Sequence, residues 1–115
     1  MSTLSHSHGA IAQKQLDAYN AQDLDAMMAF YAPDVVVSGL NGAPTETSRA
    51  ALRARYEKAF AQFPQNKAEL VNRIAVGGTV ADHEHVVRAP GGEAFDVIAI
   101  YTFQDGLISR VDFAK

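Results

Sequence analysis

Cysteine and tryptophan are absent from this 115-residue chain. The lack of cysteine excludes disulfide bonds, thiolate catalysis and cysteine-ligated metal or iron–sulfur centres. Long apolar runs are also missing, and the first ten residues lack the basic and apolar regions of a signal peptide. We therefore expect a cytoplasmic protein with no membrane partner.

The chain has no excess of positive charge. Ten Lys and Arg residues stand against 13 Asp and Glu, a net charge of −3, and the basic residues form no block. Such a balance offers no electrostatic surface to a phosphate backbone, so nucleic acid is excluded as the expected partner. The 48% hydrophobic and 20% charged content is typical of a globular protein.

A single domain is expected over residues 10–115, long enough to bury about two thirds of its unfolded surface. The preceding residues 1–9, rich in Ser and His, are predicted to be a flexible terminus. His6 and His8 lie in this segment and are expected to be solvated rather than to bind a metal.

Three helices are predicted in the first half of the chain. Apolar periodicity marks a helix over residues 10–19, and a second helix after Asp23 places Leu24, Met27, Met28 and Tyr31 on one face before Pro33 ends it. After a short valine strand at residues 35–37, Ser48 caps the longest helix, which Pro64 ends. The paired methionines are expected to be core residues.

Strand patterns fill the rest of the chain. Alternating segments at residues 69–76, 79–88, 95–103 and 107–113 are separated by turns at residues 77–78, 89–92 and 105–106. The predicted class is α+β, with a curved, mainly antiparallel sheet that wraps three N-terminal helices.

The strand at residues 95–103 is apolar on both faces. Phe95, Val97, Ala99, Tyr101 and Phe103 share one face, whereas Ile98 and Ile100 lie on the other. One face covers the helices, and the other needs a different cover. We expect a homodimer formed through the outer face of the sheet.

Three segments of the chain have a familiar pattern: residues 18–26 (AYNAQDLDA), 30–37 (FYAPDVVV) and 101–111 (YTFQDGLISRV). Together they resemble the nuclear-transport-factor-2-like superfamily, in its SnoaL-like and ketosteroid-isomerase-like branch. The resemblance implies a cone-shaped fold with a cavity. It does not define an activity, because this superfamily includes isomerases, cyclases, dehydratases, epoxide hydrolases and binding proteins.

The resemblance also allows a test for steroid isomerase activity. The family's catalytic tyrosine, base and protonated acid match Gln15, Gly39 and Ala99 in this chain. Gly39 has no proton acceptor and Ala99 no donor, while Gln15 offers an amide hydrogen bond at best. The activity of a true steroid Δ-isomerase is therefore not expected.

The densest group of ionisable residues is Asp82-His83-Glu84-His85. Strand alternation sends the two carboxylates to one face and the two histidines to the other, which disfavours a shared metal. Pairing symmetric about Gly91 turns the histidines inward, and a shift of one residue turns the carboxylates inward. Comparison with ketosteroid isomerase favours the carboxylates, so the candidate acid–base residues are Asp82 and Glu84, with His83 as the alternative.

Other residues are expected to line the cavity and to bind the ligand: Tyr31, Tyr56, Asn72, Val97, Ala99 and Tyr101. The predicted function is the binding of a small, mostly apolar organic molecule, with acid–base chemistry of the isomerase, cyclase or dehydratase type and without a cofactor. The alternative is a ligand-binding or dimerisation module without catalysis.

Overall fold

The computed structural model describes residues 3–115, with side chains from His8 onward. None of the helices in this part of the chain is long and apolar enough to cross a membrane. Three helices and six strands follow one another along the chain: α1 (Thr3–Ala21), α2 (Leu24–Met28), β1 (Tyr31–Gly39), β2 (Pro44–Glu46), α3 (Arg49–Gln62), β3 (Lys67–Val76), β4 (Thr79–Val87), β5 (Ala94–Gln104) and β6 (Leu107–Ala114).

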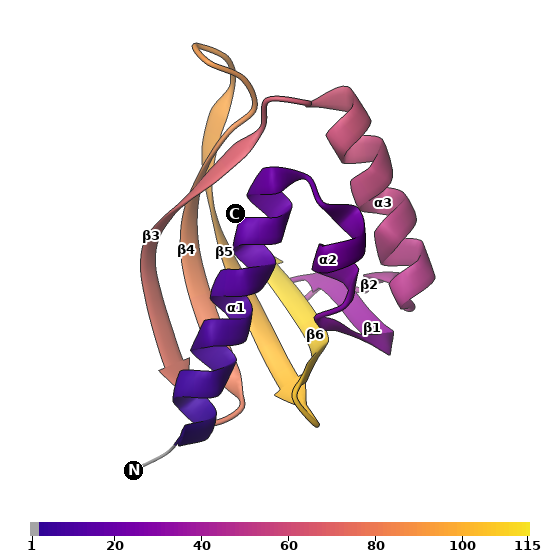
Figure 1. The fold of residues 1–115 in the computed structure, drawn as a ribbon, viewed down its shortest axis with the longest axis vertical. Helices are drawn as coiled ribbons and strands as arrows, with labels where there is room; N and C mark the ends of the chain where they lie inside the picture. The colour runs from indigo at the N-terminus through magenta and orange to yellow at the C-terminus, as the bar shows by residue number, and fades with distance from the viewer. Residues whose placement is uncertain (1–2) are drawn as a thin grey trace.

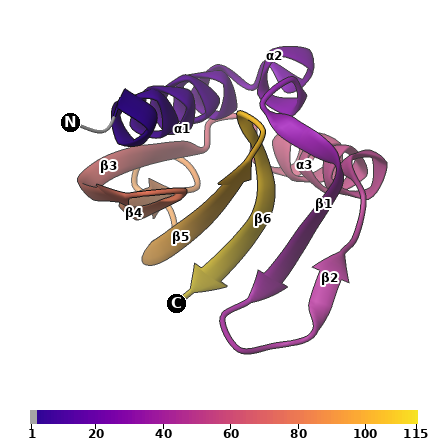
Figure 2. The same cartoon turned by 90° about the horizontal axis from the view of Figure 1, so that it is seen from below.

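All six strands belong to one curved sheet, in the order β2-β1-β6-β5-β4-β3. The strands β3 to β6 form the predicted antiparallel meander, and β1 joins it by pairing in parallel with β6. Helix α1 packs on β3 and β4, and α3 packs on β1 (Figure 1; Figure 2). The predicted α+β class is confirmed.

Several predicted element ends are also confirmed. The Asp23 carboxylate accepts a hydrogen bond from the Ala26 amide at 3.2 Å and so caps α2. The Ser48 hydroxyl accepts from the Ala51 amide at 3.1 Å and caps α3 in the same way. The β3–β4 turn contains Gly77 at φ +56°, a conformation that favours glycine.

Several element boundaries differ from the prediction, and strand β2 has no counterpart in it. Helix α1 begins at Thr3 rather than at residue 10. Tyr31 belongs to β1 and not to the second helix, because the Phe30 carbonyl accepts a hydrogen bond from the Ile108 amide at 2.9 Å, which draws the chain into the sheet. Pairing with β6 therefore overrides the helical spacing of Tyr31.

Of the expected flexible terminus, residues 1–9, Met1 and Ser2 lie outside the described residues, as does the side chain of His6. Residues 3–9 belong to α1. His8 is described, and the prediction that it is solvated is wrong. Its ring stacks on Phe103 with a centroid separation of 4.5 Å, and its Nδ1 lies 2.9 Å from the Gly77 carbonyl oxygen. The longer helix carries His8 onto the sheet.

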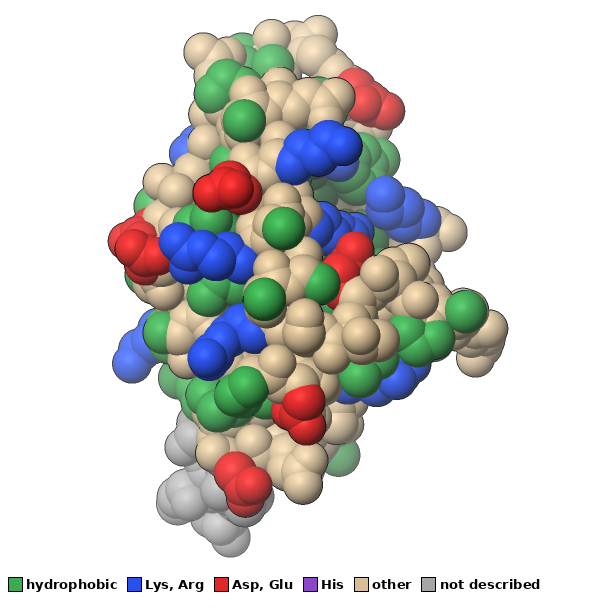
Figure 3. All heavy atoms as spheres, turned by 90° about the vertical axis from the view of Figure 1, so that its right-hand side faces the viewer, with side chains coloured by type: hydrophobic (Ala, Val, Ile, Leu, Met, Phe, Trp, Pro, Cys, Tyr) green, Lys and Arg blue, Asp and Glu red, His purple; other side chains and the backbone are tan. Residues whose placement is uncertain are grey.

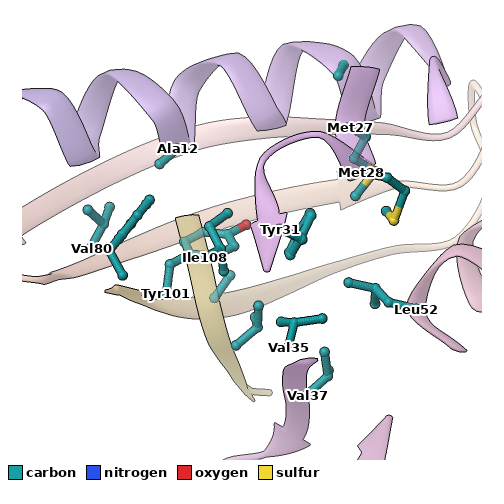
Figure 4. Packing of buried hydrophobic residues seen from close by; sticks show 14 of the residues in the cluster. Ala12, Met27, Met28, Tyr31, Val35, Val37, Leu52, Val80, Tyr101 and Ile108 are labelled. Carbon is teal, nitrogen blue, oxygen red and sulfur yellow. The ribbon is translucent and has the colours of Figure 1, made fainter. Parts of the chain in front are cut away.

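The main core lies between the helices and the concave face of the sheet (Figure 4). Met27 and Met28 are buried in it, as the sequence predicts. Near the C-terminal end of α1, the Asn20 side chain accepts a hydrogen bond from the Ala68 amide at 2.8 Å and donates one to the Ala68 carbonyl oxygen at 2.9 Å. These two bonds attach the C-terminal end of α1 to β3, beside the candidate site.

Candidate functional site

The register of β4 against β5 places the two carboxylates of the ionisable cluster inside. Asp82 pairs with Ala99 and Glu84 with Val97, and both acids are buried. The exposed fractions are 0% for Asp82 and 7% for Glu84. Both carboxylates thus point toward the helices, as predicted. The expectation that both line the cavity is wrong for Asp82, which is not among the residues that line the cavity beside Glu84.

A β-bulge in β3 changes which side chains of that strand face inward. Leu70 pairs with Glu84, but Asn72 pairs with His83, so Val71 is an extra residue in the strand. Beyond the bulge, Arg73 faces inward and Asn72 is exposed. The prediction that Asn72 lines the cavity is therefore wrong, because a bulge inverts the alternation on which it rested.

Asp82 forms an ion pair with Arg73 across the two strands. The Arg73 guanidinium donates to both carboxylate oxygens, from Nε at 2.7 Å and from Nη2 at 2.9 Å. Its Nη1 also donates to the Gln13 side chain at 2.9 Å. These two charge-assisted bonds tie the Asp82 carboxylate into a buried ion pair, which is a structural role.

A cavity of about 170 Å³ opens beside Glu84, between α1, α3 and the strands β4 to β6. Tyr56, Val97 and Tyr101 line it, as predicted. Tyr31 and Ala99 are buried in the neighbouring core and do not line this cavity. The lining residues are Gln15, Leu16, Tyr19, Arg55, Tyr56, Ala59, Glu84, Val86, Arg88, Phe95, Val97, Tyr101, Phe113 and Lys115.

Glu84 is the acid that faces this cavity. Its Oε2 is buried without a hydrogen-bond partner among the described residues. The pKa of Glu84 is raised to about 7, chiefly by burial and also by the nearby charge of Asp82, while Arg73 opposes the rise. Glu84 is therefore able to change its protonation state near neutral pH.

Three tyrosines line the cavity together with Glu84: Tyr19, Tyr56 and Tyr101. The Tyr101 hydroxyl donates to Gln15 Oε1 at 3.1 Å, a contact between the C-terminal half of the chain and α1. Burial raises the pKa of Tyr101 well above its ordinary value, so the phenol remains protonated. Because Gln15 accepts through its oxygen, its two amide N–H groups remain as donors on the cavity wall.

The histidines of the cluster lie on the outer face of the sheet. His83 Nε2 and His85 Nδ1 approach the two oxygens of Asp96 at 2.6 and 2.7 Å. This position excludes His83, the alternative acid–base candidate, from the cavity. Among the side chains that the structure describes, from His8 to Lys115, no group of three or more His, Asp or Glu is placed to hold a metal ion.

The three positions matched to ketosteroid isomerase have other roles here. Gln15 is bonded to Tyr101, Gly39 ends β1, and Ala99 is buried beside its strand partner Asp82. Asp82, on the neighbouring strand, supplies a carboxylate beside Ala99, but this carboxylate is paired with Arg73. Nothing in this geometry restores the isomerase residues.

Arg88 is a cavity residue that the sequence analysis does not identify. It follows Glu84 and Val86 on the same face of the strand, and period-2 alternation alone is enough to place it there. Its guanidinium lies over the rings of Phe63 and Phe95, 4.6 and 4.8 Å from their centroids. Figure 3, seen from the α3 side, shows several Lys and Arg side chains around a recess in the upper part of that face, with Asp and Glu side chains among them.

Known structures share this fold over nearly the whole chain. An uncharacterised cystatin-fold protein from Novosphingobium aromaticivorans is 33% identical, with a TM-score of 0.87 over 100% of this chain and 99% of that one. A candidate polyketide cyclase from Sinorhizobium meliloti is 26% identical, with a TM-score of 0.77 over 90% and 93% of the two chains. For a candidate ketosteroid isomerase from Kribbella flavida the identity is 22% and the TM-score 0.82, over 95% and 77%.

No curated protein matches the sequence. The model of the SnoaL-like domain matches residues 12–111, which is most of the chain and includes every residue of the cavity except Phe113 and Lys115. The resemblance to the SnoaL-like branch of the nuclear-transport-factor-2-like superfamily is thus confirmed, and this chain belongs to the SnoaL-like domain family.

Proposed function

We propose that the cavity binds a small organic molecule and that Glu84 transfers a proton to or from it without a cofactor. The observation that carries this proposal is Glu84, which lines the cavity and whose buried Oε2 has no hydrogen-bond partner among the described residues. An ionisable group left unpaired in an apolar site costs folding stability, and such groups cluster where chemistry needs them.

The pKa of Glu84 fits this role. A general base works best when its pKa lies near the working pH, because it is then both ionised and able to hold the proton. At a pKa of about 7, Glu84 meets this condition at neutral pH. An exposed glutamate, with its ordinary value of 4.5, is a much weaker base.

The surrounding residues support proton transfer at carbon. In the forward step, a C–H bond beside a carbonyl group of the ligand breaks and its proton binds the Glu84 carboxylate. The electron pair of that bond forms a C=C bond, and the π electrons of the carbonyl group move to its oxygen. The amide N–H groups of Gln15 supply donors for that oxygen, and Val97 contributes to an apolar wall. Return of the proton to a different carbon completes an isomerisation, whereas loss of a leaving group completes an elimination.

A chromogenic base-sensitive probe tests the proposal without knowledge of the natural ligand. In 5-nitrobenzisoxazole, removal of the C3 proton breaks the N–O bond and releases a coloured phenolate. This compound, with two fused rings, is of the size that a cavity of about 170 Å³ accepts. We expect a rate that rises with pH with a midpoint near 7, the pKa of Glu84.

Glu84→Gln keeps the shape of the side chain and removes the base. We expect it to lower the rate by about 10² or more. The matched control is Glu93→Gln in the exposed β4–β5 turn, which should leave the rate unchanged. Probe binding with equal turnover in the wild type and in Glu84→Gln would contradict the catalytic role and favour a non-catalytic binding module.

A further inference from the structure

The mouth of the cavity is positively charged. Besides Glu84, the charged side chains that line it are Arg55, Arg88 and Lys115. Arg55 is neutralised by Glu46, with Nη1 2.8 Å from Oε1. In the described part of the chain, neither Arg88 nor Lys115 has a carboxylate within ion-pair distance.

Arg88 is held in place by its neighbours. Its Nη1 donates to Asn66 Oδ1 at 2.9 Å, and the buried Asn66 in turn donates to the Tyr19 hydroxyl at 2.6 Å. Phe63 and Phe95 contact the guanidinium through their ring faces. These contacts use one of the five N–H donors of the guanidinium and hold its plane in a fixed orientation.

Lys115 adds a second cation at the same ring. Its Nζ lies 4.7 Å from the Phe95 centroid, so Phe95 contacts both positive groups. Two cations at one ring repel each other, and the attraction of an anion bound beside them offsets that repulsion. A planar guanidinium with free donors matches the two oxygens of a carboxylate better than it matches a neutral group.

An apolar part of the lining lies between the cations Arg88 and Lys115 and the carboxyl group of Glu84. Glu84, Val86 and Arg88 follow at two-residue intervals on one face, which separates the first and last Cα atoms by roughly 13 Å. Val86 and its strand partner Phe95 fill this interval. A ligand that reaches both ends therefore has a charged head and an apolar body of about one ring.

We propose that the ligand of this cavity is a small monocarboxylate, whose carboxylate binds Arg88 and Lys115 while its apolar body extends toward Glu84. The inference rests on the proposed function for the location of the reacting carbon, and it replaces the mostly apolar ligand expected from the sequence with an amphiphilic anion. The binding itself does not depend on catalysis.

Binding of phenylacetate and of its neutral isostere phenylacetamide tests the proposal. Titrations followed by amide chemical shifts of the whole chain at pH 6 give both dissociation constants. We expect phenylacetate to bind at least about tenfold more tightly, since charge-assisted hydrogen bonds form only with the acid. Equal affinity for the two compounds overturns the proposal.

Arg88→Met retains the apolar stem of the side chain and removes its charge. We expect this variant to lose most of the preference for phenylacetate, and Lys115→Gln to reduce it. The control is Arg53→Met, because Arg53 pairs with Asp25 on the outer surface of α3, away from the cavity. If Arg88→Met does not fold, Lys115→Gln still decides. A preference for phenylacetate as large as that of the wild type would then contradict the proposal.

Glu84→Gln separates this proposal from the catalytic one. The variant lacks the base, yet it should bind phenylacetate at least as tightly as the wild type. Between pH 6 and 8 the wild type should bind several-fold more weakly as Glu84 ionises, whereas Glu84→Gln should show little change. The charged and titratable groups around Glu84 that contribute to this dependence are Asp82, Arg73, Tyr19, Tyr31, Tyr56, Tyr101, Arg55, Arg88 and Lys115.

A wild type that binds phenylacetate selectively but does not turn over 5-nitrobenzisoxazole would contradict the proposed catalysis and support the carboxylate site. Turnover of 5-nitrobenzisoxazole that depends on Glu84, with no preference for phenylacetate over phenylacetamide, would support the proposed catalysis and contradict the carboxylate site. The two proposals can thus fail separately.

Discussion

Replacement of Glu84 by Gln should stabilise the protein at alkaline pH and have little effect at acidic pH. The substitution keeps the size and shape of the side chain and removes the buried negative charge. Its effect on the free energy of unfolding follows from the pKa of Glu84, which rises from the ordinary 4.5 to about 7 on folding. Desolvation by burial is the largest cause of this rise.

The sign of the effect follows from proton binding. Below about pH 4.5 the carboxyl is protonated in both the folded and the unfolded chain, and its burial as a neutral acid is tolerated. Between pH 4.5 and 7 the folded state binds more protons than the unfolded state, so stability is lost as the pH rises. Above pH 7 the full cost of the buried charge is present.

The magnitude follows from the separation of the two pKa values. Each pH unit between them corresponds to about 1.36 kcal/mol, so the wild type should lose about 3 kcal/mol between pH 4.5 and 8 through this group. Glu84→Gln should not undergo this loss. At pH 8 the variant should therefore exceed the wild type in stability by about 3 kcal/mol, and at pH 4.5 the two should be similar.

Urea unfolding of both proteins at pH 4.5, 6 and 8 measures these differences, with Glu93→Gln as the control for an exposed glutamate. The pH dependence of the difference between the two proteins carries the test, because other groups that titrate contribute equally to both. A difference that stays constant from pH 4.5 to 8, or a variant less stable than the wild type at pH 8, would refute the assignment of a buried, unpaired carboxylate at this position.

Three further predictions concern the core, the activity and the assembly. Arg73→Met leaves the fully buried Asp82 unpaired and should cost about 3 to 5 kcal/mol in urea unfolding, whereas the double variant with Asp82→Leu should recover most of this loss. We expect no turnover of a 3-oxo-Δ5 steroid at a kcat/KM of about 10⁴ M⁻¹s⁻¹ or more, because the three catalytic residues of the isomerase are replaced. A spectrophotometric assay that reaches this value would show that another residue acts as the base. Exposed Ile74 and Ile98 on the outer sheet face should lie in the interface of a homodimer. Sedimentation should therefore give twice the 12.4 kDa chain mass for the wild type and the mass of a single chain for Ile98→Glu. A wild type that sediments as a monomer at micromolar concentration rules this out.

Local sequence signals determined most of the fold. Asp23 and Ser48 mark helix starts because their side chains cap amide groups a few residues away. Gly77 marks a turn because its φ is positive, and alternation along β5 identifies its buried face. Each of these signals depends on interactions between residues close together in the chain, so each can be recognised from the sequence alone.

Tertiary structure decided the chemistry of the site. The sequence left two registers open for the cluster at residues 82–85, and only the pairing of β4 with β5 shows that Glu84 faces the cavity. The bulge at Val71 then turns Arg73 inward, where it neutralises Asp82 and leaves Glu84 as the unpaired acid. A register and a bulge depend on how whole strands pack together, and a shift of one residue exchanges the faces of a strand. The sequence by itself therefore determined which residues were candidates, and the packing of the strands determined which of them is unpaired in the cavity.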